Sequence, residues 1–271
     1  MENFKLQEIA TNVRKDIVRM IHNAKSGHPG GSLSIADIMT VLYFEEMNIT
    51  TDNLNDVNRD KFVLSKGHAS PAIYGVLKAK GFLTDEDVMS FRLINSNIQG
   101  HPSKKNTAGV DMSTGSLGQG ISAAVGIALS NKLRGNEFRT YSILGDGECQ
   151  EGQVWEALMA ASHYNLDNLC VFLDYNGLQI DGNITNVMNP EPFKAKFEAF
   201  GLNVLNINGH DYDEIKNALK QARETKGKPT MIIAHTVKGK GVSFMENNYG
   251  WHGQAPSDEN LAQALSDLEV K

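Results

Sequence analysis

The start of the chain carries apolar side chains with the period of an amphipathic helix. Within residues 6–25 they recur at steps of three and four, at Leu6, Ile9, Ala10, Val13, Ile17, Met20 and Ile21. A turn cluster rich in glycine follows at 26–31, and a second helical stretch follows at 35–46. The pattern therefore predicts two helices separated by a glycine-containing loop.

Further along, short apolar runs alternate with amphipathic segments. The runs with the length and composition of buried strands are 61–65, 140–144, 169–174, 203–207 and 230–235. The helical segments among them are 121–133, 153–163, 192–200 and 211–225, and Thr84 marks a further helix start. This order is typical of an α/β protein whose mostly parallel central sheet has helices on both faces. We expect a single domain over residues 1–271, with ligands bound at the carboxyl edge of the sheet.

Composition narrows the possible partners. The chain of 271 residues carries a formal net charge of −6, which argues against nucleic acid or an anionic membrane as partner. It has no apolar run of about 18 residues and no signal peptide before the first helix, so no membrane span is expected. Cys149 and Cys170 lack metal-ligand spacing and suggest a reducing compartment. We expect a cytoplasmic protein.

Two polar residues follow predicted strands and suggest a metal site. Asp146 lies in a Gly-Asp-Gly sequence directly after one strand, and Asn176 follows the next strand 30 residues later. In a parallel sheet both strand ends lie at the same edge, so the carboxylate and the amide oxygen can meet there. Such oxygen ligands, completed by phosphate oxygens, suit Mg²⁺. Gly-Asp-Gly alone also occurs as a plain turn, and it is the pairing with the asparagine that favours a diphosphate site.

This pairing is the thiamine-diphosphate motif, and the surrounding residues resemble transketolase in particular. The segment 145–152 with 155–157 has the transketolase pattern, and four further segments resemble that family in the same order. They are 26–30, 64–69, 100–102 with 114–120, and 238–242 with 251–253. The resemblance covers nearly the whole chain and implies the diphosphate-binding (PP-domain) fold.

The resemblance implies roles for individual residues. The implied metal ligands, for Mg²⁺ or for Ca²⁺ as a substitute, are Asp146, Asn176 and the backbone carbonyl of Leu178. The implied thiamine-diphosphate contacts are His68, Gly115, Ser116, Leu117, Gly147, Glu148, Asn176 and His252. The implied catalytic residues, which face the substrate hydroxyls, are His28, His101 and His252. Two carboxylates are implied to link active sites across the interface between subunits, Glu151 and Glu156.

Each of these residues also has an ordinary structural interpretation. Histidines in proteins are often only hydrogen-bonded or solvated, and we interpret His22, His163, His210 and His235 in that way. The four histidines of the family segments differ because all of them lie in glycine-flanked loops, where side chains converge on a ligand. Glu151 and Glu156 stand at the start of a predicted helix, where acidic residues also favour the helix dipole.

The implied function is that of the N-terminal subunit of a split transketolase. Such an enzyme moves a two-carbon ketol unit from a ketose phosphate, or a similar anionic ketose, to an aldose. The pyrimidine-binding and C-terminal domains of a full transketolase are missing from this sequence, which implies a partner subunit that carries them and an α2β2 assembly. Ser116 departs from the family, since many transketolases have proline there.

Two alternatives stay open. One is another thiamine-diphosphate enzyme, such as a deoxyxylulose-phosphate synthase or a dehydrogenase component, although the histidine loops and the 150–152 segment favour transketolase. The other is a non-catalytic scaffolding relic of the domain, which the retained ligands and histidines disfavour.

Overall fold

A five-stranded parallel sheet forms the centre of the computed structural model, which describes residues 1–269. The strands lie in the order β1-β2-β3-β7-β6, and each neighbouring pair is parallel. Their bounds are β1 Lys61–Leu64, β2 Thr140–Gly145, β3 Leu169–Tyr175, β6 Asn203–Asn208 and β7 Thr230–His235. Because all five strands run the same way, the loops after them emerge at one edge.

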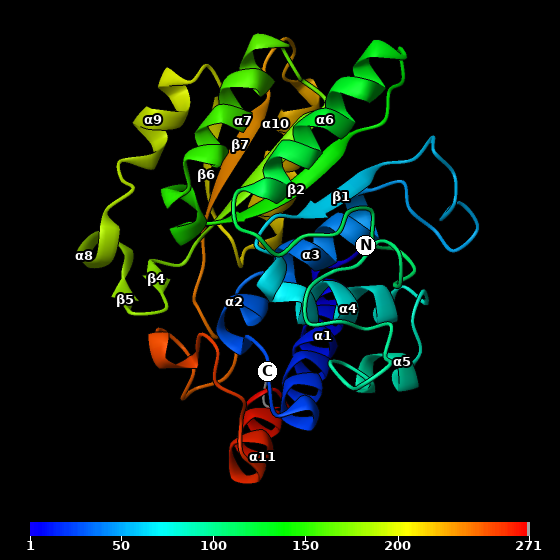
Figure 1. Cartoon of the computed structure of the whole chain (residues 1–271), viewed down its shortest axis with the longest axis vertical. Helices are drawn as coiled ribbons and strands as arrows, with labels where there is room; N and C mark the ends of the chain where they lie inside the picture. Colours follow the sequence, from blue (N-terminus) through cyan, green and yellow to red (C-terminus); the bar gives the residue numbers. More distant parts are fainter. Residues whose placement is uncertain (270–271) are drawn as a thin grey trace.

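Helices pack on both faces of this sheet (Figure 1). One core includes residues of α1 (Asn3–Ala24), α3 (Ala36–Val41), α4 (Ser70–Ala79) and α10 (Tyr212–Glu224). The other core includes residues of α6 (Gln119–Leu133), α7 (Gly152–His163) and α9 (Phe193–Ala199). Successive residues of each strand point to opposite faces, so Phe172 joins the first core while Val171 and Leu173 join the second. The predicted α/β fold with helices on both faces is confirmed.

The remaining helices and turns complete the fold. They are α2 (Pro29–Leu33), a π-helical turn (Leu42–Glu46), α5 (Asp85–Met89), α8 (Ile184–Met188), α11 (Asp258–Asp267) and 3₁₀ turns at Gly67–Ala69, Gly147–Gln150 and Tyr249–Trp251. Strands β4 (Leu178–Gln179) and β5 (Gly182–Asn183) form a small antiparallel pair directly after β3. The predicted cap at Thr84 is confirmed, because Thr84 and Asp87 form a reciprocal capping box.

The sequence pattern missed two long helices and simplified two others. Helices α4 and α11 have no counterpart among the predicted elements. Gly75 interrupts the periodicity of α4 because its backbone packs tightly on α1, where an added Cβ would lie 3.1 Å from Val13 Cγ1. The stretch at 35–46 divides into α3 and the π-helical turn, and the glycine-containing loop at 26–31 includes the start of α2. Among residues 1–269, no helix has both the length and the apolar character needed to cross a bilayer.

Candidate functional site at the carboxyl edge of the sheet

Four neighbouring strands each place a polar side chain at the same edge. Lys66, Asp146 and Asn176 follow β1, β2 and β3, and Lys238 follows β7, the next strand in the sheet. These residues line one cavity of about 330 Å³. Its other lining residues are His28, Gly31, His68, Gly115, Leu117, Gly145, Gly147, Glu148, Gln150, Glu151, Leu178, Gln179, Ile180, Asp181 and His252. The cavity has the size and the convergent polar groups of a small-molecule site.

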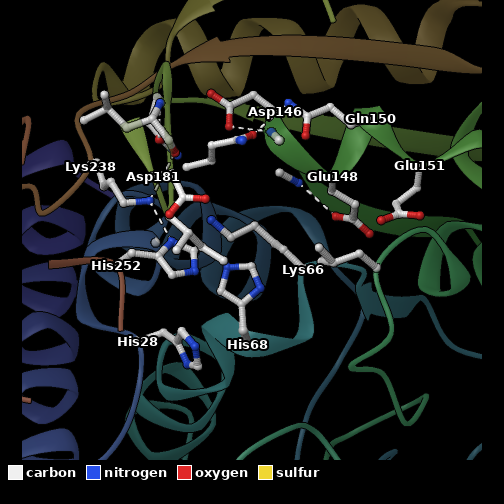
Figure 2. Close-up of a pocket in the computed structure, with 18 of the residues that line it drawn as sticks. His28, Lys66, His68, Asp146, Glu148, Gln150, Glu151, Asp181, Lys238 and His252 are labelled. Carbon is white, nitrogen blue, oxygen red and sulfur yellow. Dashed lines mark hydrogen bonds between the residues drawn. The ribbon is translucent and has the colours of Figure 1, made fainter. Parts of the chain in front are cut away.

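The cavity is polarised between an acidic side and a histidine side (Figure 2). Asp146 and Gln150 lie at one side, His28, His68 and His252 lie at the other, and Lys66 lies between them. The centres of the three imidazole rings lie 5.3, 5.4 and 5.3 Å apart, so the rings form a triangle. The Nδ1 atom of His28 is buried without a hydrogen-bond partner among the described residues. A polar atom left in this way is available to a ligand.

The three histidines are electrically neutral at pH 7. Burial, helped by the positive charge of Arg92, lowers the pKa of His28 to about 4. Burial and the ammonium of Lys238 lower the pKa of His252 to about 3. Burial and the charge of Lys66 hold the pKa of His68 well below its usual value. Neutral imidazoles both accept and donate hydrogen bonds, so this side of the cavity suits hydroxyl groups.

Asp146 is buried and held by the backbone of its own loop and of the next. Its Oδ1 accepts from the Gly147 amide at 2.8 Å, and its Oδ2 accepts from the Gly177 amide at 2.6 Å. Burial and the negative charge of Asp174 raise the pKa of Asp146 to about 7. A carboxylate in this setting gains a large electrostatic benefit from a nearby cation.

Asp174 is a buried carboxylate that holds surrounding side chains of the site by hydrogen bonds. It is fully buried, and its carboxylate accepts hydrogen bonds from Ser34 at 2.8 Å, from the Asn176 amide nitrogen at 2.9 Å, and from Lys66 and Thr236. Burial alone would raise the pKa of Asp174, but the Lys66 ammonium lowers it overall. Because the side-chain nitrogen of Asn176 donates to Asp174, the Oδ1 atom of Asn176 points away from Asp174.

Two further groups organise the loops. Glu148 is buried, and it accepts from Ser65 Oγ at 2.6 Å, from the Gly118 amide at 2.9 Å and from the Gly145 amide at 3.0 Å. Lys238 is 2% exposed, and its ammonium lies 3.2 Å from the Leu178 carbonyl oxygen and 3.1 Å from His252 Nδ1. Burial and the nearby charge of Lys66 lower the pKa of Lys238 to about 8.

The comparisons with known proteins agree on one family. The sequence profile described as "Transketolase, thiamine diphosphate binding domain" matches residues 6–271. The chain belongs to this family. Transketolase from Campylobacter jejuni superposes with a TM-score of 0.94 at 38% identity, over 99% of this chain and 43% of that one.

Two relatives have nearly the same length as this chain. The 6-deoxy-6-sulfo-D-fructose transketolase subunit SqwG of Clostridium sp. (strain MSTE9) is 43% identical over 99% of this chain and 98% of its own. An apulose-4-phosphate transketolase subunit of Phocaeicola vulgatus is 40% identical over 95% of this chain and 92% of its own. Human transketolase is 40% identical, and the chain spans 41% of it. The predicted membership of the transketolases, a family of enzymes, is confirmed.

Most of the predicted site residues of this transketolase chain line the cavity, and three do not. His101 is exposed, and its ring packs on the Gly115 loop, where an added Cβ at Gly115 would lie 3.2 Å from the ring. Ser116 and Glu156 are also exposed and lie outside the lining. Of the histidines interpreted as structural, His210 pairs with Asp37, and His22 pairs with Asp258.

The sequence reasoning missed the two lysines and Asp174. Lys66 and Lys238 lie within the segments that resemble the family, and each precedes a glycine near a strand end. Those glycines were the sequence signal that could have identified the two lysines as site residues. Asp174 ends an apolar strand with a charged residue, which burial in a core does not favour unless the charge has a partner. Three of its four partners, Ser34, Lys66 and Thr236, lie 62 to 140 residues away along the chain, so only the fold brings them to Asp174.

The residues present fit a diphosphate and a hard cation. An alanine Cβ at Gly31 would lie 3.3 Å from Lys66 Nζ and 3.6 Å from His68 Nε2, so the glycine keeps space open beside both groups. Lys66 and Lys238 supply positive charge for a diphosphate. The predicted metal set has one carboxylate together with amide and carbonyl oxygens. Accordingly, residues 1–269 contain no cluster of three or more His, Cys, Asp or Glu side chains suited to a metal. Mg²⁺ accepts such a mixed oxygen set when phosphate oxygens complete it.

Proposed function

We propose that this chain is the diphosphate-binding subunit of a thiamine-diphosphate- and Mg²⁺-dependent transketolase that moves a two-carbon ketol unit between sugars. The observation that carries the proposal is the polarised cavity: the residues suited to a metal diphosphate lie at one side, and three neutral histidines lie at the other. Membership of the transketolase family supports it. The names of the two relatives of equal length support the same reaction class.

The acidic side of the cavity holds the metal and the diphosphate. Asp146, the side-chain oxygen of Asn176 and the backbone carbonyl of Leu178 are the proposed metal ligands. Lys66 and Lys238 balance the negative charge of the diphosphate, and the glycines at 145 and 147 allow its close approach to the backbone. Ca²⁺ is a possible substitute, since such sites accept both ions to some degree.

The histidine side binds and orients the sugar. Thiamine diphosphate, when bound, supplies the electron sink for cleavage of the carbon–carbon bond. His28, His68 and His252 are neutral at pH 7, so each can accept a hydrogen bond from a hydroxyl or donate one to it. We propose that His28 and His252 hold substrate hydroxyls, that His101 joins them at the rim when substrate is bound, and that His68 contacts the cofactor.

The substrate is proposed to be an anionic ketose and the assembly to be α2β2. The names of the two relatives specify a sulfonated ketose in one case and a phosphorylated ketose in the other. Three relatives named as subunits match over 98, 92 and 96% of their own length, so each works as a chain of about this size. The partner would be a second chain that carries the pyrimidine-binding domain, and Glu151 and Glu156 are proposed to lie at the interface between subunits.

The test is two-carbon transfer by the chain mixed with its partner, sought in a neighbouring reading frame. The donors are xylulose 5-phosphate, apulose 4-phosphate and 6-deoxy-6-sulfo-D-fructose, each offered with ribose 5-phosphate as the aldose that accepts the two-carbon unit. Mass spectrometry detects the shortened carbonyl product of the donor and the lengthened acceptor. We expect turnover of at least one donor by the mixture and none by either chain alone.

The matched variants are Asp146→Asn and Asp181→Asn, since both acids line the cavity and only the first is a proposed ligand. Asp146→Asn should lower turnover at least roughly 100-fold, whereas Asp181→Asn should retain most of it. Equal effects of the two substitutions would contradict the assigned metal site.

A further inference from the structure

The segment 236–239 carries Lys238 into the cavity, and three of its backbone amides donate hydrogen bonds to other segments. The Thr236 amide donates to the Tyr175 carbonyl at 3.1 Å, and the Gly239 amide donates to the Gly30 carbonyl at 2.9 Å. Between them, the Val237 amide donates to a side chain, His210 Nε2, at 2.9 Å. The residue that follows this contact is Lys238, whose own backbone carbonyl accepts from the Asn247 amide at 2.9 Å. The Val237 contact is therefore one of the hydrogen bonds that set the position of the Lys238 ammonium.

The hydrogen bonds of His210 determine which ring nitrogen carries the proton. Because Nε2 accepts from the Val237 amide, it has no proton of its own, and the ring proton is on Nδ1. Nδ1 lies 2.7 Å from Asp37 Oδ2, so it donates to that carboxylate. The hydrogen bonds therefore run from the Asp37 carboxylate through the His210 ring to the Val237 amide. By accepting the proton of Nδ1, Asp37 fixes the tautomer in which Nε2 is free to accept from Val237.

Asp37 is itself held firmly. It is 4% exposed, and it accepts from Arg14 at 3.0 and 2.6 Å and from Tyr212 Oη at 2.7 Å. The Arg14 guanidinium is buried against it, and the two form an ion pair. Burial would raise the pKa of Asp37, but the charge of Arg14 holds it well below its usual range. The carboxylate therefore stays ionised and supports His210 from α3, while Arg14 belongs to α1.

We infer that His210 is a positioning residue for the cofactor site: through the Val237 amide it fixes the segment that delivers the Lys238 ammonium to the diphosphate side of the cavity. This inference rests on the proposed function, because the diphosphate is the ligand that Lys238 would meet. His210 itself lies outside the cavity lining. His210, interpreted from the sequence as an ordinary structural histidine, thus acts on the site through Val237 and Lys238.

Three substitutions separate positioning from plain stability. His210→Leu removes both ring nitrogens, and His210→Gln keeps an oxygen acceptor of similar reach. Tyr212→Phe is the matched control, because it deletes a 2.7 Å hydrogen bond to the same carboxylate without touching Val237. Thermal unfolding of each variant gives the stability that it loses. If the leucine variant does not fold, His210→Ala, which adds no bulk, replaces it.

The first readout needs no cofactor and uses the chain alone. Hydrogen–deuterium exchange of peptides covering 236–241 should rise in His210→Leu and stay close to wild type in Tyr212→Phe. The second readout is isothermal titration of thiamine diphosphate with Mg²⁺ into the chain mixed with its partner. His210→Leu should weaken binding by roughly 10- to 100-fold, His210→Gln should recover most of the affinity, and Tyr212→Phe should bind as wild type.

The outcomes distinguish the two proposals. If wild type binds the cofactor and folded His210→Leu binds equally well, the role of His210 is refuted and the proposed function stands. If His210→Leu and Tyr212→Phe weaken binding equally, in proportion to lost stability, the role of His210 is again refuted. If the wild-type mixture binds no thiamine diphosphate, the proposed function fails, and the role of His210 in cofactor binding fails with it.

Discussion

The histidine triangle makes the stability of the chain sensitive to acid, and His28→Asn tests this directly. His28 has a folded-state pKa of about 4 against an ordinary value of 6.5. Between these values the unfolded chain binds a proton that the folded chain excludes. Stability from this group is therefore fully present above pH 6.5 and is lost as the pH falls toward 4. The asparagine variant has no titrating group at this position and lacks that loss.

The size of the effect follows from the two pKa values. At pH 5, an unfolded-state pKa of 6.5 and a folded-state pKa of about 4 correspond to about 2 kcal/mol of lost stability for His28. The side chain is only partly buried, and solvent screening reduces the expected loss to about 1 kcal/mol. His252, whose pKa is lowered to about 3, adds a loss of similar size.

The assay is urea unfolding of the chain without cofactor at pH 7.5 and at pH 5.0. The free energy of unfolding of wild type should fall between these pH values by about 1 kcal/mol more than that of His28→Asn. His163→Asn, at an exposed position on α7, should behave as wild type. An unchanged pH dependence in His28→Asn would refute the neutral, buried state assigned to this ring.

Two other substitutions test the support of the site by stability alone. Asp174→Asn leaves the buried Lys66 ammonium without its anionic partner and should cost about 3–5 kcal/mol in denaturant unfolding, whereas a loss below about 1 kcal/mol would contradict the ion pair. Gly239→Ala should cost at least about 2 kcal/mol, because φ is +80° and the new Cβ would lie 2.3 Å from the Met245 carbonyl oxygen. Gly177→Ala has a similar φ of +75° but open space, so about 1 kcal/mol is expected there, and equal losses at the two glycines would contradict the close approach.

Much of the fold could be predicted because local pattern and tertiary structure agree. The central strands of the sheet are buried on both faces, which gives continuous apolar runs such as 169–173. Helix α4 was missed because Pro71 and Gly75 break its periodicity, although the proline occupies the first turn, where it is tolerated. Helix α11 was missed although its capping box, Ser257 with Asn260, was a readable signal.

The site could be predicted only as far as its motifs reach. Asp146 and Asn176 follow from strand ends at a shared edge, and the sequence alone places them together. Ser34 and Lys66, which bind Asp174, and Asp37, which binds His210, each lie more than 100 residues from their partner along the chain, so no local pattern indicates these contacts. His210 follows Gly209 much as His28 follows Gly27, so an adjacent glycine did not single it out. Its role depends on contacts that only the packing of α3 against the 208–212 turn creates.

The most direct test of the central claim is cofactor binding by the assembled subunits. Thiamine diphosphate is titrated into the mixture of this chain and its partner, with Mg²⁺ and then with the metal removed by EDTA. The account predicts saturable binding that is lost with EDTA and at least roughly 100-fold weaker in Asp146→Asn. A folded mixture that binds no cofactor, or that binds it equally well in Asp146→Asn, would contradict the metal–diphosphate site at the carboxyl edge of the sheet.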